Sequence, residues 1–239
     1  MSSDAIKRFY ESVSVESLGN MWAVSLDGRG VKTPARADLV FPNKALAAAV
    51  ATEWEDQGDV LDVAGMHLTR LANVAIDRTP VTRAEMAQEV VRFCETDLTC
   101  HLAEHPAELR EAQETAWRPI RDWAGPALGI MLLPVHGIVA AMQPAASLVA
   151  ARGHADGLDD FRLTGLVFGC GQFGSALLAL AVEQGEIDAL DAFERANTDE
   201  IFQESRWGED TEALALRQAK RLEAAALGAW FETLATVNP

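Results

Sequence analysis

The sequence predicts an α+β fold: a strand-rich N-terminal domain with one or two helices, residues 1–80, followed by an all-helical bundle, residues 81–239. Apolar residues near the N-terminus alternate with the period of two that a half-buried strand shows, and later ones recur at helical spacing. No strand is predicted after Thr79-Pro80. A run of strands followed by a run of helices is typical of α+β proteins.

The strands are predicted from alternation and from turn residues. Residues 9–15 alternate with the strand period and are expected to form the first strand. Residues 21–26 and 31–33 flank Asp27-Gly28, a dipeptide that tolerates positive φ in a tight hairpin turn. Residues 39–41 predict another short strand, which Pro42 ends.

The helices are predicted from caps and apolar spacing. Asn43 is a good N-cap for a helix over residues 43–57, and a short helix is expected over residues 66–76. The run from Thr82 to Glu85 has the pattern of a capping box, and Pro106 starts another helix. Further helices are predicted at residues 145–152, 159–184, 187–207 and 211–235.

The charge of the chain is strongly acidic and unevenly placed. It carries 36 acidic and 20 basic residues, a net charge of −16. Residues 1–80 contain 11 acidic and 8 basic residues, whereas residues 81–239 contain 25 and 12. Such a field repels nucleic acid, so nucleic-acid binding is excluded. An acidic face more often keeps a protein soluble than recognises a basic partner, and both readings stay open.

The cysteines and the N-terminus bear on the compartment. Cys94, Cys100 and Cys170 are odd in number and form no CxxC pair, which is typical of free thiols in a reducing compartment. Met1-Ser2-Ser3-Asp4 lacks the basic and apolar regions of a signal peptide, so we expect a cytoplasmic protein. The uncharged run of residues 163–182 is long enough to span a bilayer, but its glycines and polar residues favour a buried bundle helix.

The segment from Gly169 to Gly174 matches GxGxxG, the dinucleotide fingerprint. The fingerprint works between a strand and a helix N-terminus, whereas the residues before it, including Gly165, have a helical pattern. Close helix packing explains the glycines more simply. A small cofactor-dependent enzyme using residues 169–174 is kept as the alternative function. Ser175 does not lie in a nucleophile elbow, and no base–nucleophile pair is evident.

A metal site is not expected. Cys94, Cys100, His101 and His105 lie near one another in sequence, but their spacing does not bring them to one face of a helix. Pro106 indicates that the helix has ended by then, and a structural zinc needs four converging ligands.

The predicted 187–207 helix carries an unusual stripe. Phe193, Ala196, Glu200, Gln203 and Trp207 follow steps of three, four, three and four, which place them on one face. A carboxylate and an amide therefore interrupt an apolar seam. Glu200 can be a polar anchor in a binding groove or can pair with an arginine across a helix interface, and spacing does not decide between them.

A set of motifs in order along nearly the whole chain now suggests a family. They are Leu26-Asp27-Gly28-Arg29, Lys32-Thr33-Pro34, the run from Ala51 to Gln57, the run from Met66 to Leu71, Thr96-Asp97, Gln113 with Trp117-Arg118-Pro119-Ile120, and the run from Asp199 to Gln203 with Trp207-Gly208. Together they resemble the assembly chaperone that binds the α subunit of the catalytic head of the F-type ATP synthase, found in mitochondria and some bacteria. Arg118 departs from the family, which often has an acid there.

The resemblance implies a chaperone that keeps free α subunit from aggregating until β subunits replace it, without catalysis, cofactor, metal or small-molecule substrate. Eukaryotic relatives would act in the mitochondrial matrix. The acid of the family's E-x-F/Y-Q motif corresponds to Glu200, and we expect Asp199, Glu200, Gln203 and Trp207 to contact the partner. Trp54, Asp97 and Trp117 are expected to be structural. A general scaffold with an acidic face is a third possibility.

Overall fold

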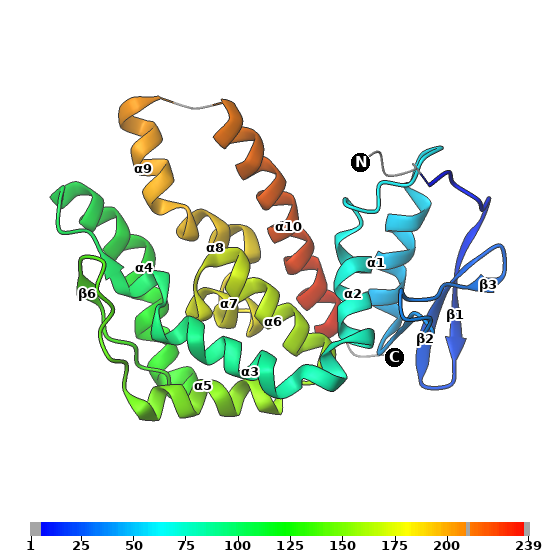
Figure 1. Cartoon of the computed structure of the whole chain (residues 1–239), viewed down its shortest axis with the longest axis horizontal. Coiled ribbons are helices and arrows are strands. Elements are labelled where there is room, and N and C mark those ends of the chain that lie inside the picture. The colour runs from blue at the N-terminus through cyan, green and yellow to red at the C-terminus, as the bar shows by residue number, and fades with distance from the viewer. Residues whose placement is uncertain (1–5, 209–210, 237–239) are drawn as a thin grey trace. The chain divides into compact units, whose positions relative to one another are not determined.

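The computed structural model describes residues 6–208 and 211–236, so Met1–Asp4 lie outside the described residues. The chain divides into two units, one formed by residues up to Val81 with those from Ala229 onward, the other by Thr82–Gly228. The sequence-based division put all of residues 81–239 in the second domain, whereas residues from Ala229 group with the first. Most strands lie in the N-terminal part, two strands of two residues lie later, and helices dominate the rest, which confirms the α+β prediction (Figure 1).

Unit 1 contains an antiparallel sheet, four-stranded among the described residues: β1 (Val13–Leu18), β2 (Met21–Leu26), β3 (Arg29–Gly30) and β4 (Val40–Phe41). β2 is central, because it pairs with β1 on one edge and with both β3 and β4 on the other. The predicted hairpin turn is confirmed. Asp27 and Gly28 have φ values of 48° and 72°, the positive values that a type I′ turn requires at both positions.

The first strand begins later than the alternation predicted. Residues before Val13 are outside β1, and there Phe9 is 68% exposed while Tyr10 is 5% exposed. The Asp27 carboxylate explains the late start, since it accepts hydrogen bonds from the Glu11 and Ser12 N–H groups at 3.1 and 2.9 Å. These two N–H groups are therefore satisfied by a side chain rather than by a neighbouring strand.

Two other strand predictions were wrong. The third strand was expected at residues 31–33 but lies at Arg29–Gly30, and the Val31 N–H donates to the Val24 carbonyl at 2.9 Å just beyond it. After Pro80, where no strand was predicted, β5 (His101–Leu102) pairs in parallel with β6 (Val135–His136). Strands of two residues are too short to show an alternation pattern.

Two helices complete the main part of unit 1: α1 (Lys44–Glu55) packs on β1, β2 and β4, and α2 (His67–Asp77) packs on α1. The predicted N-cap is confirmed, because the Asn43 side chain accepts from the Leu46 N–H at 2.9 Å. Glu53 of α1 accepts from the Leu68 and Thr69 N–H groups at 2.7 and 2.8 Å. Its carboxylate thus satisfies the free N–H groups at the start of α2 and joins the two helices.

Unit 2 is mainly helical. Its elements run from α3 (Thr79–Glu95) and the 3-10 turn η1 (Leu98–Cys100) through α4 (Ala107–Leu128), α5 (Ala145–Gly157), α6 (Asp160–Phe173), α7 (Ala176–Glu183), α8 (Ala189–Ala196) and α9 (Thr198–Trp207) to α10 (Thr211–Ala235). The start of α3, up to Val81, and the end of α10, from Ala229, belong to unit 1. The eight residues of α7 are all buried, and α6, α8 and α4 pack around it (Figure 1). A break was predicted at Thr79-Pro80, but α3 begins there and its non-helical residue is Thr82, with φ −122°.

The helix predicted over residues 159–184 is two helices. Gly174 ends α6 in the left-handed conformation, with φ 63°, and the Ser175 side chain caps α7 by accepting from the Leu178 N–H at 3.1 Å. Neither α6 nor any other helix of residues 6–208 and 211–236 combines the length and the apolar character that crossing a membrane requires.

The helix predicted over residues 187–207 is also two helices, α8 and α9, which meet at Asn197. The Asn197 side chain donates to the Phe193 carbonyl at 2.7 Å, and the Thr198 hydroxyl donates to the Arg195 carbonyl at 2.7 Å. Polar side chains thus take the last carbonyls of α8, which ends the helix. The five-residue stripe predicted along one continuous helix is therefore wrong.

Candidate functional site

The α9 helix presents a polar and aromatic face to solvent. None of its residues is buried, and Trp207 is 77% exposed. Glu200, Gln203 and Trp207 are all exposed and follow steps of three and four, so they lie on one face of α9. Glu200 forms no hydrogen bond or ion pair with any residue that the structure describes. Of the two readings of Glu200, the geometry favours a surface contact over a pair across a helix interface, and its role in binding stays a prediction.

A hydrogen bond from Gln113 of α4 fixes the position of the Asp199 side chain. The buried Gln113 of α4 donates through Nε2 to Asp199 Oδ1 at 2.8 Å, and its Oε1 accepts from the Ala103 N–H at 2.7 Å. One amide side chain therefore fixes both the first turn of α9 and the chain that follows β5. Asp199 is half-buried and lies in the first turn of α9, at the edge of the exposed face.

Trp117 and Arg195 fix the junction of α8 and α9. The Trp117 ring is 0% exposed, and its Nε1 donates to the Arg195 carbonyl at 2.8 Å. Arg195 in turn donates to the Ala116 carbonyl at 2.6 Å and pairs with Asp191 at 3.0 Å. The burial of Trp117 supports the structural role expected of it, which stays a prediction.

Asp97 organises the centre of unit 2. It is 0% exposed and accepts hydrogen bonds from the Thr99 N–H and hydroxyl at 3.0 and 2.7 Å, the Ser175 hydroxyl at 2.7 Å and the Leu177 N–H at 3.0 Å. Burial raises the pKa of this carboxyl, while the hydrogen bonds act in the opposite direction. Because Leu177 lies in the first turn of α7, Asp97 caps the most buried helix, so its place in the fold is structural in character.

The sequence reasoning missed an exposed apolar loop around β6. Ile138 is 96% exposed, Val139 80% and Met142 93%, and the nearby Met131 and Leu133 are also exposed. The base of the loop is fixed, because the Gln143 side chain makes two hydrogen bonds to the Leu133 backbone, at 2.7 and 3.1 Å. An uncharged run over residues 130–142, broken by Pro134 and Gly137, was the signal available in the sequence.

The apolar loop and the α9 face belong to one region of unit 2. β6 pairs with β5, and Ala103 follows β5 directly. Gln113 bonds to both Ala103 and Asp199, so one side chain links the strand pair to the root of α9. Gln113 of α4 thus ties the chain after β5 to the first turn of α9, and the exposed apolar side chains and the polar face of α9 belong to the same unit.

Trp54 lies in unit 1 and is half-buried rather than fully buried. Its carbonyl accepts from the Tyr10 hydroxyl at 2.6 Å, and the two rings meet edge to face with centroids 5.8 Å apart. These contacts join α1 to the N-terminal segment, in keeping with the expected structural role.

Comparison with known proteins now assigns the chain. The family model described as ATP12 chaperone protein matches residues 7–125. The crystal structure of Atp12 from Paracoccus denitrificans is 35% identical and superposes with a TM-score of 0.88, over 95% of this chain and 98% of that chain. The chain belongs to the ATP12 chaperone family. This is a family of ATP synthase assembly chaperones, so the resemblance drawn from the motifs is confirmed.

Two further proteins match this chain over similar lengths. The Atu1473 protein of Agrobacterium tumefaciens is 33% identical, with a TM-score of 0.90 over 95% of this chain and 86% of that chain. The mitochondrial protein atp12 of Schizosaccharomyces pombe is 22% identical over 216 residues, which are 85% of this chain and 74% of that protein.

The geometry that the cofactor alternative needs is not present at residues 169–174. Gly169 to Phe173 are the end of α6, with a helix rather than a strand before the motif. The three thiols are buried, and burial raises the pKa of each, to about 12 for Cys100. They are therefore protonated at neutral pH and poor nucleophiles. Within residues 6–208 and 211–236, no three His, Cys, Asp or Glu side chains come together as metal ligands would.

Proposed function

We propose that this ATP12-family protein binds the free α subunit of the F-type ATP synthase and keeps it from aggregating until β subunits replace it. A subunit destined for a ring exposes a large apolar interface before assembly, and such surfaces aggregate. The proposed site of action is the cytoplasm, for which the three unpaired thiols are an argument.

The observation that carries the proposal is the exposed face of α9, with Glu200, Gln203 and Trp207 side by side on a helix that buries none of its residues. An exposed tryptophan beside a carboxylate and an amide supports a partner contact, since tryptophan is enriched at the centres of protein interfaces. The apolar loop at Ile138 and Val139 supplies the uncharged part that an aggregation-prone client would need.

We further propose that the protein acts by binding alone, without catalysis. The buried, protonated cysteines and the helical setting of residues 169–174 support this, because neither offers an activated nucleophile or a phosphate cradle.

The test is charge reversal at Glu200. Glu200→Lys should fold but lose its hold on purified α subunit, because reversing a charge in a matched interface costs several kcal/mol. Glu200→Gln keeps the shape and one acceptor and should be milder. Co-purification with α subunit, and separately with β subunit, measures binding, and circular dichroism on the same preparations measures folding.

Asp122→Lys is the matched control, since Asp122 is also an exposed helical acid in unit 2 and has no ion-pair partner among the described residues. It should bind α subunit as the wild type does. A folded Glu200→Lys protein that retains α subunit normally would remove Glu200 from the interface. Equal retention of α and β subunits by the wild type would favour a general scaffold instead.

A further inference from the structure

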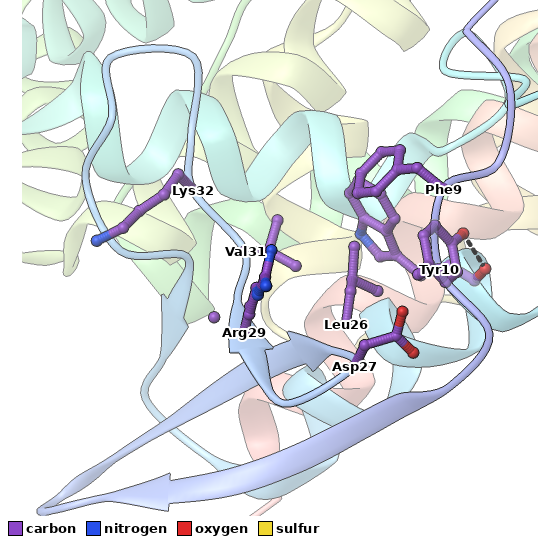
Figure 2. A pocket seen from close by; sticks show the side chains of 9 residues that line it. Phe9, Tyr10, Leu26, Asp27, Arg29, Val31 and Lys32 are labelled. Carbon is purple, nitrogen blue, oxygen red and sulfur yellow. Dashed lines mark hydrogen bonds between the residues drawn. The ribbon is translucent and has the colours of Figure 1, made fainter.

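Unit 1 contains a cavity that the proposed function does not use. Its volume is about 440 Å³, within the range of sites that take a ligand or a side chain. Figure 2 shows Phe9 and Tyr10, on the segment before β1, on one side of the cavity and Arg29, Val31 and Lys32 on the other. Leu26 and Asp27, at the end of β2, lie between them, and Trp54 of α1 completes the lining.

The lining of this cavity is aromatic and partly open. The Phe9 and Tyr10 rings meet edge to face with centroids 5.4 Å apart, and Tyr10 meets Trp54 in the same way. Phe9 is 68% exposed although it is a large apolar residue, while Leu26 is 6% exposed. A cavity with a continuous aromatic wall and an exposed aromatic at its mouth suits an apolar side chain brought by another molecule.

One lining residue has an unsatisfied donor. The Trp54 indole nitrogen is buried and has no hydrogen-bond partner among the described residues. A buried N–H without an acceptor costs free energy, and such groups are rare in folded proteins unless a ligand or a bound molecule satisfies them. This nitrogen is closed to solvent, so an occupant of the cavity would meet the Trp54 ring and not its N–H.

The charged residues at the mouth of the cavity favour an acidic group in the occupant. Arg29 is exposed and makes no hydrogen bond or ion pair with any residue that the structure describes, and Lys32 lies beside it on the same segment, paired with Asp38. Asp27 is the carboxylate in the lining, and its oxygens already accept from the backbone of Glu11 and Ser12. Arg29 acts on Asp27 only through space, as the smallest of the influences that lower the pKa of that carboxyl, so its guanidinium keeps donors for an acidic group brought by another molecule.

We propose that this cavity is a second contact for the client, and that it takes an extended segment in which an apolar side chain is flanked by an aspartate or glutamate. The apolar side chain packs against Phe9 and the aromatic wall behind it, and the acid pairs with Arg29. The inference rests on the proposed function, because the client is the α subunit. A contact on unit 1 in addition to unit 2 lets one chaperone hold a large subunit at two weak sites, so that each can be released in turn.

Cross-linking tests the proposal directly. Phe9 is replaced by the photoreactive aromatic analogue p-benzoylphenylalanine, the protein is incubated with purified α subunit and irradiated, and the joined peptide is identified by mass spectrometry. The control carries the same analogue at Leu18, which is 57% exposed but lies at the far end of β1, roughly 17 Å along the strand from the Val13 end. We expect a product from Phe9 and none from Leu18, with an Asp or Glu next to an apolar residue in the joined peptide.

Two substitutions supply a quantitative readout. Phe9→Ala removes the exposed ring at the mouth of the cavity and should weaken binding of purified α subunit roughly three- to ten-fold, the usual effect of losing one aromatic contact. Arg29→Glu should weaken it at least ten-fold at low salt and less at high salt, whereas Arg36→Glu, outside the cavity on the same loop, should have little effect.

The outcomes separate the two proposals. Wild-type protein that retains α subunit but gives no Phe9 product would overturn the cavity contact and leave the proposed function standing. Folded Phe9→Ala and Arg29→Glu proteins that bind as the wild type does would have the same consequence. A joined peptide without an acidic residue would overturn the recognition rule. Wild-type protein that does not retain α subunit at all would overturn both.

Discussion

The glycines of the GxGxxG segment separate helix packing from nucleotide binding, and two of them form a matched pair. Gly169 and Gly171 both lie in α6, two residues apart. A Cβ atom at Gly169 would lie 3.1 Å from Ala179 Cβ and 3.1 Å from Leu227 Cδ2, whereas a Cβ at Gly171 meets nothing within 4 Å. Packing therefore makes opposite predictions for Gly169→Ala and Gly171→Ala.

The magnitudes follow from two competing terms. Alanine is favoured over glycine inside a helix by about 1 kcal/mol, so Gly171→Ala should stabilise the protein by up to that amount. Gly169→Ala gains the same term, but overpacking costs about 1–3 kcal/mol. The Leu227 methyl can turn away, while Ala179 Cβ moves only with the backbone of α7. Gly169→Ala should thus be roughly 1–3 kcal/mol less stable than Gly171→Ala.

Thermal and chemical unfolding measure the difference. For a chain of this size, 1 kcal/mol corresponds to roughly 2–4 °C in Tm, so the two variants should differ by several degrees. Urea unfolding with unchanged m-values would confirm that stability, not the unfolded state, has changed. Two variants of equal stability would refute the packing argument. Loss of α-subunit binding in a folded Gly171→Ala protein would show that this part of α6 has a function beyond packing.

Three further predictions concern stability and ligands. Burial raises the pKa of Glu183, but hydrogen bonds from His154, Gln184 and Arg162 outweigh it and leave the pKa below its usual value of 4.5. The Glu183 carboxylate therefore stabilises the fold at neutral pH, and this contribution is lost as the pH falls below about that value. Glu183→Gln should therefore lower the free energy of unfolding by roughly 2–3 kcal/mol at pH 7, somewhat less than for a fully buried pair because the Arg162 side chain is 25% exposed. The variant should also lose less unfolding free energy than the wild type between pH 5 and pH 3. Trp54→Arg should lower the unfolding free energy in urea by roughly 1–3 kcal/mol, below the cost for a fully buried tryptophan since Trp54 is half-buried, and a variant that melts like the wild type would show that the Tyr10 contact contributes little. Millimolar NAD or ATP, or a chelator, should leave Tm unchanged in differential scanning fluorimetry, whereas a ligand at 100 times its dissociation constant would add about 2.7 kcal/mol.

Local signals predicted much of the fold. The Asp27-Gly28 turn and the Asn43 cap were readable from the sequence because each depends on a few adjacent residues. The division into a strand-rich start and a helical remainder followed from the change of apolar period. The family was readable for a different reason, since its motifs keep their order along the chain.

What the tertiary structure decided depends on contacts between distant residues. The late start of β1 comes from Asp27, across a turn, and the break between α6 and α7 is held by Asp97, 78 residues before Ser175. No periodicity within residues 159–184 could reveal that carboxylate.

The candidate site shows the same division. The sequence supplied Glu200, Gln203 and Trp207, but placed them on a helix that continues from Phe193, which is 1% exposed. Asn197 ends that helix, so the buried and exposed members of the stripe lie on different elements. The sequence alone determined the family, the fold class and the identity of the polar residues on α9. Only the tertiary structure decided that these residues face solvent and that the loop around β6 exposes its apolar side chains, because exposure depends on which distant side chains cover a surface.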